Sequence, residues 1–208
     1  MAINTIMFSQ YANKAALLAG LKTIIDGYEF FDTTNIDETN GTLTCNVGDF
    51  CAMKVITDSS SIVITKIQFW STNNCSSSYI KGGSWTNEYI NKIILTSKAI
   101  YFGCTNHASD YCAIGKTSNG ELGVVYGAGG NTQCLNVFST VATNSAVDIT
   151  PKRIDNSNVT TLSPLPIVNG GDIMQDMYVI IACENTAAGN YTLNGTNYYS
   201  DGYVMLAD

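Results

Sequence analysis

Apolar residues follow a helical period near the start of the chain and a strand-like pattern over most of the rest. Within residues 9–27, SQYANKAALLAGLKTIIDG, leucines and isoleucines recur three or four positions apart, which places them on one face of an α-helix. Ser9 is the expected N-terminal cap, and Gly27 is the expected C-terminal stop. The predicted apolar stripe consists of Leu17, Leu18, Leu21, Ile24 and Ile25.

The next stretch, YEFFDTTNIDETNGT at residues 28–42, shows neither the helical nor the strand-like pattern of apolar residues. It is acidic and rich in threonine and asparagine, so it predicts a linker or an arm rather than a regular element. We therefore expect two parts, a helix with a linker arm at residues 1–40 and a β domain at residues 41–208. The helix and arm are expected to dock or link, while the β domain packs.

From about residue 42 onward, short β-branched or aromatic runs alternate with turn dipeptides, as is typical of strands. No strand–helix–strand alternation interrupts them, so the sheet is expected to be antiparallel. This many short strands predict a mainly β fold, an antiparallel β-sandwich or a small barrel, preceded by the short N-terminal α-helix. The runs are CAMKVIT, SIVITKIQFW, KIILTS, AIYFGCT, YCAIGK, GVVYG, CLNVFSTVA, MYVIIAC and the closing segment.

Asn-Gly pairs mark the expected tight turns, because both central positions of a type I′ turn need a positive φ. YCAIGKTSNGELGVVYG, residues 111–127, is the strongest predicted hairpin. The segment GGSWTNEYINKI, residues 82–93, is expected to add one helical turn before a strand at 93–96. The pairs lie at 40–41, 119–120, 169–170 and 194–195.

The last twenty residues, GNYTLNGTNYYSDGYVMLAD, predict a register in detail. A two-residue turn at 194–195 pairs Tyr191 with Tyr198 and places Tyr199 on the opposite face. A second such turn at 201–202 places Met205 beside Tyr198 and Val204 beside Tyr199. The face of Tyr198 is expected to be core, and that of Tyr199 an association surface. Apolar Val204 and Leu206 predict that the terminal strand is covered on both faces.

The composition of the chain argues against several classes of function. The net charge of −7 and the pI near 4.5 argue against a nucleic-acid partner, which would need clustered lysine and arginine. No apolar run approaches the roughly 18 residues of a membrane span. The opening MAINTIMFSQYANK lacks the basic segment of a secretory signal, so we expect neither export nor a membrane anchor.

The 7 cysteines are expected to be free, largely buried thiols, with Cys45 and Cys51 as the candidate pair for a single disulfide. Cys104, His107 and Cys112, with Cys134 or Cys75 as a fourth ligand, resemble a zinc set in residue type. Their spacing lacks the paired Cys-x-x-Cys knuckles of such sites, so we expect no metal and no other cofactor. The alternative is that Cys104 and Cys112 are core residues on neighbouring strands.

Enzymatic candidates are few. His107, beside Asp110, is the only histidine that could serve a nucleophilic triad, and a turn histidine is usually solvated. The pairs Asp32 with Asp37 and Asp172 with Asp176 could serve glycoside hydrolysis only at a suitable separation. The glycine-rich GVVYGAGGNT at residues 123–132 lacks a phosphate-binding order. We therefore expect no catalytic residue.

Aromatic residues leave a binding function open. Trp70, Trp85 and the tyrosines of the C-terminal segment could stack on a sugar, with neighbouring asparagine and aspartate supplying hydrogen bonds. The competing interpretation is that a tryptophan in a strand run such as KIQFW belongs to the core. A carbohydrate-binding module, attaching to a surface glycan, is the alternative function.

Residues 136–208 resemble the C-terminal part of small structural proteins of tailed bacteriophages. The features are TTLSPLP at 160–166 before the strand run MYVIIA, and a closing NYTLNGTNYYSDGYVMLAD that reaches residue 208. The resemblance implies a non-enzymatic virion component, such as a head-surface (capsid), neck or tail protein, assembled in the bacterial cytoplasm. Its partners would be copies of itself and other virion proteins. The expected interface residues are Leu17, Leu21, Ile24, Tyr199, Val204 and Leu206.

Overall fold

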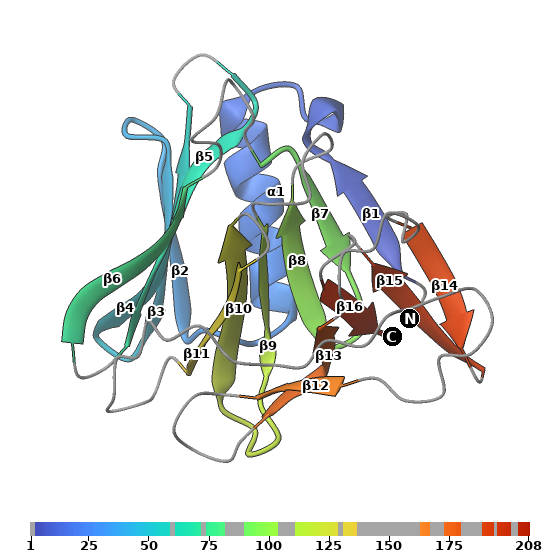
Figure 1. The fold of residues 1–208 in the computed structure, drawn as a ribbon. Helices are drawn as coiled ribbons and strands as arrows, with labels where there is room; N and C mark the ends of the chain where they lie inside the picture. The colour runs from blue at the N-terminus through green and yellow to red at the C-terminus, as the bar shows by residue number, and fades with distance from the viewer. Residues whose placement is uncertain are drawn as a thin grey trace.

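The described residues form antiparallel β-sheets and one α-helix near the N-terminus (Figure 1). The predicted mainly β, sandwich-like architecture is therefore confirmed. In the described part of the chain, no helix is long and apolar enough to cross a membrane. The computed structural model describes residues 3–58, 61–71, 74–81, 90–103, 111–128, 131–136, 163–166, 173–179, 189–193, 195–200 and 204–208.

The described residues form three sheets, which we name by their order along the chain, although β1 of the central sheet precedes the N-terminal sheet. The N-terminal sheet has the order β2(Thr33–Asp37), β3(Thr42–Val47), β4(Phe50–Thr57), β5(Ile64–Ser71) and β6(Asn74–Lys81). The central sheet has the order β1(Asn4–Met7), β7(Lys92–Leu95), β8(Ala99–Gly103), β9(Tyr111–Lys116), β10(Leu122–Ala128) and β11(Asn131–Asn136). The C-terminal sheet has the order β12(Ser163–Pro166), β13(Ile173–Val179), β16(Val204–Ala207), β15(Thr196–Ser200) and β14(Gly189–Leu193).

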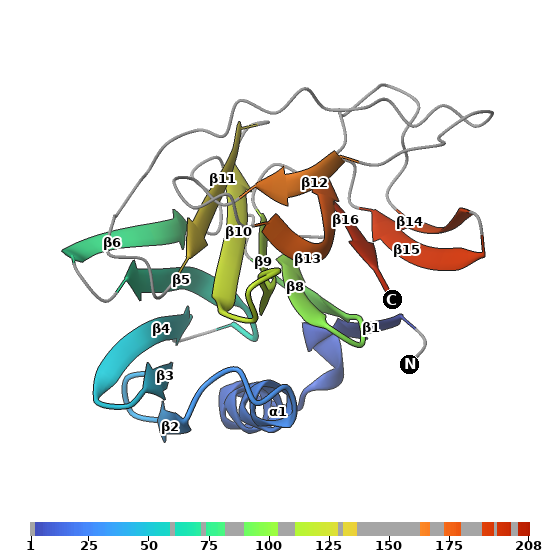
Figure 2. The ribbon, with the colours of Figure 1, turned by 90° about the horizontal axis from the view of Figure 1, so that it is seen from below.

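The central sheet lies in the middle of the molecule, with α1 and the N-terminal sheet on one side and the C-terminal sheet on the other (Figure 2). The side chains of strand β8 show how the central sheet packs on both of its faces. Ile100 and Phe102 point into the buried cluster shared with α1 and the N-terminal sheet. Tyr101 points the opposite way, where its ring centroid lies 5.7 Å from that of Tyr199 on β15. Burial on both faces explains why AIYFG is apolar without alternation.

Helix α1(Lys14–Gly27) carries the predicted apolar stripe into this cluster, where Leu17, Leu18, Leu21 and Ile25 are all buried. The expected cap at Ser9 is wrong. Ser9 lies in a separate 3-10 turn, η1(Phe8–Gln10), and Asn13 caps α1 by accepting a hydrogen bond from the Ala16 N–H at 2.9 Å. Asn13 is better placed because its side chain reaches the third amide of the helix. The predicted end at Gly27 is confirmed.

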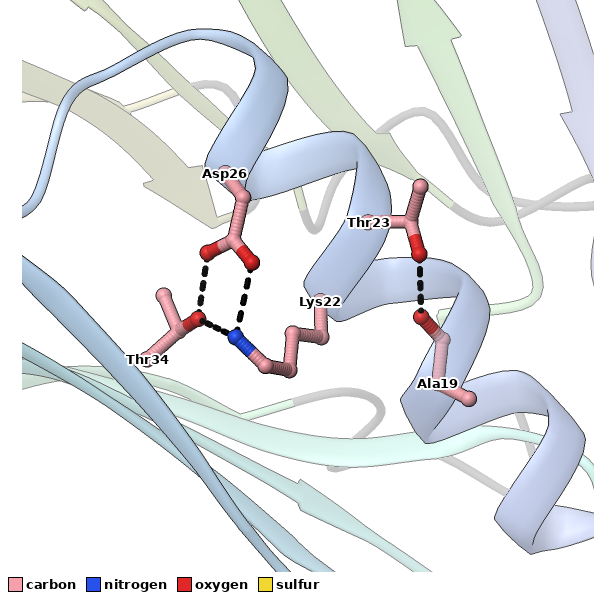
Figure 3. A network of polar contacts seen from close by, with 5 residues as sticks. All are labelled: Ala19, Lys22, Thr23, Asp26 and Thr34. Carbon is pink, nitrogen blue, oxygen red and sulfur yellow. Dashed lines mark hydrogen bonds and ion pairs between the residues drawn. The ribbon is translucent and has the colours of Figure 1, made fainter.

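The expected arm after the helix is wrong over residues 33–37, which form strand β2 and pair with β3. Only Thr34 of β2 is buried, so the strand has almost no apolar signal. A polar cluster holds β2 on the helix (Figure 3). Lys22 Nζ donates to Asp26 Oδ2 at 2.7 Å and to Thr34 Oγ1 at 2.6 Å, and the Thr34 hydroxyl donates to Asp26 Oδ1. The buried cluster thus crosses the boundary expected at residue 40.

Three of the predicted Asn-Gly turns can be compared with the described residues, and among these three only the turn at 194–195 is a two-residue hairpin. Gly41, Gly120 and Gly195 all have positive φ, at 64°, 81° and 81°. Between β2 and β3 the last pair is Asp37 with Thr42, and between β9 and β10 it is Lys116 with Leu122, so both connections are longer than two residues. Glycine alone takes the left-handed position there, as in hairpin loops built on a type I turn. The pair at 169–170 and the expected helical turn within 82–89 lie outside the described residues.

Candidate association edge of the C-terminal sheet

Strands β14 and β15 form the hairpin that the sequence predicts. The turn at 194–195 pairs Leu193 with Thr196, Tyr191 with Tyr198, and Asn190 with Tyr199, which confirms the expected register. The positive φ of Gly195 makes this turn possible without steric cost. This hairpin therefore fixes which side chains of the closing segment share a face.

The predicted pairing of the final strand is wrong by two positions. Ser200 pairs with Met205 and Tyr199 with Leu206, so four residues instead of two separate the partners of the last pair. A turn at 201–202 would have paired Tyr199 with Val204. Because side chains alternate with a period of two, an even shift preserves the faces, and Tyr199 still shares its face with residues 204 and 206.

Burial reverses the expected roles of the two faces. Tyr199 is only 6% exposed, packs against Tyr101, and its hydroxyl accepts a hydrogen bond from Lys92 Nζ at 3.3 Å. Leu206, on the same face, is fully buried. Tyr198, expected in the core, is half-buried. Ala207, on the other face of β16, is 4% exposed, so the expectation that the terminal strand is covered on both faces is confirmed at 206–207.

Strand β14 is one of the two edge strands of the C-terminal sheet. In a two-residue hairpin the residues flanking the turn exchange hydrogen bonds, so the pairing alternates away from the turn. Thr192 and Asn197 form a non-hydrogen-bonded pair, and the Asn197 carbonyl accepts instead from the Asp208 N–H at 3.0 Å. The backbone groups of Thr192 and Asn190 therefore point outward from the sheet, and both residues are exposed.

The composition of this edge favours pairing with a further strand. Natural edge strands are commonly protected by lysine, proline or a bulge, which prevent addition of another strand. The sequence of β14 is GNYTL, without a charged residue or proline, and its register with β15 is continuous. We call the outward backbone groups of Asn190 and Thr192 the association edge.

The other expected interface residues are placed mostly inside the chain. Leu17, Leu21 and Leu206 have no exposed surface, so in the folded chain they stabilise the core and cannot contact a partner. Ile24 is half-buried and packs at the border of the core cluster. Val204 lies in β16, but its side chain is outside the part described.

Cysteines whose side chains are described are free: Cys45 and Cys112 are buried and Cys51 is half-buried. The candidate disulfide between Cys45 and Cys51 is therefore not formed. Burial raises the thiol pKa of Cys45 and of Cys112, so both are protonated, unreactive core groups. Cys112 belongs to the buried cluster, opposite Phe102 of β8, as the core alternative predicts.

Metal and catalytic candidates are only partly covered by the structure. The described residues contain no group of three or more potential metal ligands. Asp37 accepts hydrogen bonds from the Asn40 backbone N–H at 3.0 Å and side-chain amide at 2.6 Å, and these bonds lower its pKa. Asp32 accepts from the Gly48 N–H at 2.6 Å, so both carboxylates stabilise turns. Outside the described side chains lie Cys75, Cys104, His107, Asp110, Cys134, Asp172 and Asp176.

The sugar-stacking hypothesis stays a prediction. Trp70 is half-buried in β5, while Trp85 lies outside the described residues. Tyr191 and Tyr198 are direct neighbours across the hairpin and are both half-buried. Tyr199 is used in packing on Tyr101 and is not available as a platform.

Comparisons with known proteins add no relative: no protein-family model, no curated protein and no solved structure matches this chain.

Proposed function

We propose that this protein is a non-enzymatic structural component of a tailed-phage particle that associates with further copies of itself through the C-terminal sheet. The association edge carries the proposal, because it offers outward backbone donors and acceptors on a strand without the usual protection. The resemblance of residues 136–208 to phage structural proteins is the reason for proposing a tailed-phage particle. Head-surface, neck and tail positions are all compatible with it.

The mode of association follows from the geometry of the edge. Asn190 and Thr192 stand two positions apart on β14, so their outward groups lie on the same side of the strand. When two copies of β14 pair in antiparallel orientation, Asn190 of each copy can lie opposite Thr192 of the other copy. Such contacts are isologous, and they close a symmetric dimer that a larger particle can use as a building unit.

The experiment is to compare the oligomeric state of the wild type with two edge variants by sedimentation. Thr192→Lys places a charge on the exposed edge, and Thr192→Pro also removes the outward N–H. Both variants are expected to shift the chain toward monomer without a large change in unfolding midpoint. Asn197→Lys is the matched control, because Asn197 is exposed on the same face but belongs to the inner strand β15.

Loss of association in Asn197→Lys and retention in both Thr192 variants would contradict the edge as the contact. A wild-type chain that is monomeric at every soluble concentration would contradict self-association. The virion role is tested separately, by mass spectrometry of purified phage particles from a host that carries the gene.

A further inference from the structure

A pocket of about 560 Å³ opens at the C-terminal end of α1. Its walls come from the last turn of the helix, from the residues that follow it, and from the turn between β7 and β8. This volume lies within the range of about 300–1,000 Å³ that is usual for small-molecule sites. Its lining includes Ile24, Tyr28, Phe30, Leu95, Ser97 and Lys116.

Hydrogen bonds between distant segments hold the walls in place. The Tyr28 hydroxyl donates to the Thr96 carbonyl, which ties the end of the helix to the β7–β8 turn. On the same turn, the Ser97 N–H donates to Asp208 Oδ1 at 2.8 Å. The rings of Tyr28 and Phe30 lie with centroids 5.1 Å apart and planes tilted by 41°. The pocket is thus formed before any ligand arrives, which lowers the entropy cost of binding.

The apolar part of the pocket lies between two elements. Ile24 on the helix and Leu95 at the end of β7 both line it and are both half-buried, and Tyr28 adds an aromatic wall. These side chains have accessible apolar surface that a ligand can remove from water, at about 25 cal/mol per Å². The body of the ligand is therefore expected to be aliphatic or aromatic.

The pocket lining contains a cationic group that a ligand anion can contact. Lys116 Nζ lies 5.7 Å from the centroid of the Phe30 ring, and Lys98 also lines the pocket. Two negative groups lie at the same site. They are the C-terminal end of α1, equivalent to about half a negative charge, and the Asp208 carboxylate. That carboxylate already accepts the Ser97 N–H. Lys116 is the ammonium that lies over the Phe30 ring of the pocket lining, so it is the group that the carboxylate of a bound ligand would contact.

We infer that this pocket binds a small carboxylate with an apolar body. The body packs between Ile24, Leu95 and Tyr28, and the carboxylate lies against the Lys116 ammonium. Lys116 is the residue that distinguishes a carboxylate from the corresponding neutral amide, because the apolar walls contact both compounds alike.

The test uses phenylacetate and its neutral amide, phenylacetamide, as probes of the full chain by isothermal titration and by NMR. Phenylacetate is expected to bind and to shift the methyl signals of Ile24 and Leu95. Lys116→Met keeps the length of the side chain and removes its charge. This variant is expected to weaken phenylacetate binding roughly five- to tenfold, as loss of a charge-assisted contact does. Its affinity for phenylacetamide is expected to stay the same. Lys54→Met on β4, outside the pocket, is the matched control and is expected to change neither.

The inference is overturned if phenylacetamide binds as tightly as phenylacetate, or if neither probe shifts the two methyl signals. It is equally overturned if Lys54→Met weakens binding as much as Lys116→Met, since the effect would then be general. A capped Phe-Asp dipeptide provides the remaining comparison. Binding of this dipeptide in preference to phenylacetate would assign the pocket to a segment of another protein and would exclude a small ligand as its occupant.

Discussion

Tyr198 and Tyr199 are adjacent in sequence but have different roles, and this difference can be measured. Tyr199→Ala is expected to reduce the free energy of unfolding by about 3–5 kcal/mol, as truncation of a buried aromatic ring does. It removes the packing on Tyr101 and the hydrogen-bond acceptor of Lys92. Tyr198→Ala truncates a half-buried ring and is expected to cost about 1–2 kcal/mol. Urea denaturation of the two variants makes the comparison, and an equal or larger loss in Tyr198→Ala would contradict it.

Sequence predicts which residues of the hairpin share a face but not which face is buried. Alternation and the Asn-Gly turn place Tyr199 opposite Asn190, and that much follows from β14 and β15 alone. Apolar content favours the face of Tyr198, yet the buried face is that of Tyr199. The choice depends on Tyr101 and Lys92, which lie on β8 and β7 of another sheet. No local pattern contains that information.

At the scale of elements, the strands that sequence reasoning missed are mostly at the edges of sheets. Strands β1, β2, β6 and β12 each end a sheet in the observed order, and none was among the expected runs. An edge strand forms backbone hydrogen bonds with one neighbour only, and it can be polar, as TTNID in β2 is. Inner strands such as β8 to β10 are covered on both faces, so their apolar runs were recognised. Strand β3 was missed as well, although it is an inner strand.

The contact between α1 and β2 predicts a dependence of stability on pH. Hydrogen bonds from Lys22 and then from Thr34 lower the pKa of Asp26 below its ordinary value of 3.8. A carboxyl group with a lowered folded pKa contributes stability above its unfolded pKa and loses it as pH falls through the folded pKa. Asp26→Asn is therefore expected to lose at most about 1 kcal/mol at neutral pH, because Lys22 and Asp26 are 38% and 45% exposed.

The measurement is the free energy of unfolding as a function of pH for the wild type and for Asp26→Asn. The difference between them is expected to shrink as pH falls below about 4 and to disappear below the lowered folded pKa of Asp26, where its carboxyl is protonated in both states. Asp49→Asn, an exposed aspartate in the turn between β3 and β4, is the control and is expected to leave the curve nearly unchanged. A difference that stays constant down to acidic pH would show that Asp26 acts through packing and not through its charge.

At the scale of the whole molecule, sequence reasoning predicts the antiparallel class but not the number or order of the sheets. The order depends on long-range pairings such as β1 with β7, which join residues 4–7 to residues 92–95. The predicted helix is present, but an apolar stripe looks the same whether it covers its own sheet or a partner. In this fold Leu17 and Leu21 have no exposed surface, so the stripe completes the core of its own chain.

Removal of residues 1–40 tests whether the helix and β2 are part of the fold or an attachment to it. The deletion removes α1, the edge strands β1 and β2, and six buried apolar side chains: Phe8, Leu17, Leu18, Leu21, Ile25 and Phe30. Burial of each such side chain stabilises by about 1.5–3 kcal/mol, so the loss is on the order of the entire net stability of about 5–15 kcal/mol. Residues 41–208 are therefore expected to show no cooperative unfolding by circular dichroism.

Leu21→Ala in the full chain, which leaves all the strands in place, is expected to unfold cooperatively with a loss of about 2–5 kcal/mol. If the truncated chain instead unfolds with the midpoint of the wild type, residues 41–208 are an independent domain and the boundary predicted at residue 40 is correct.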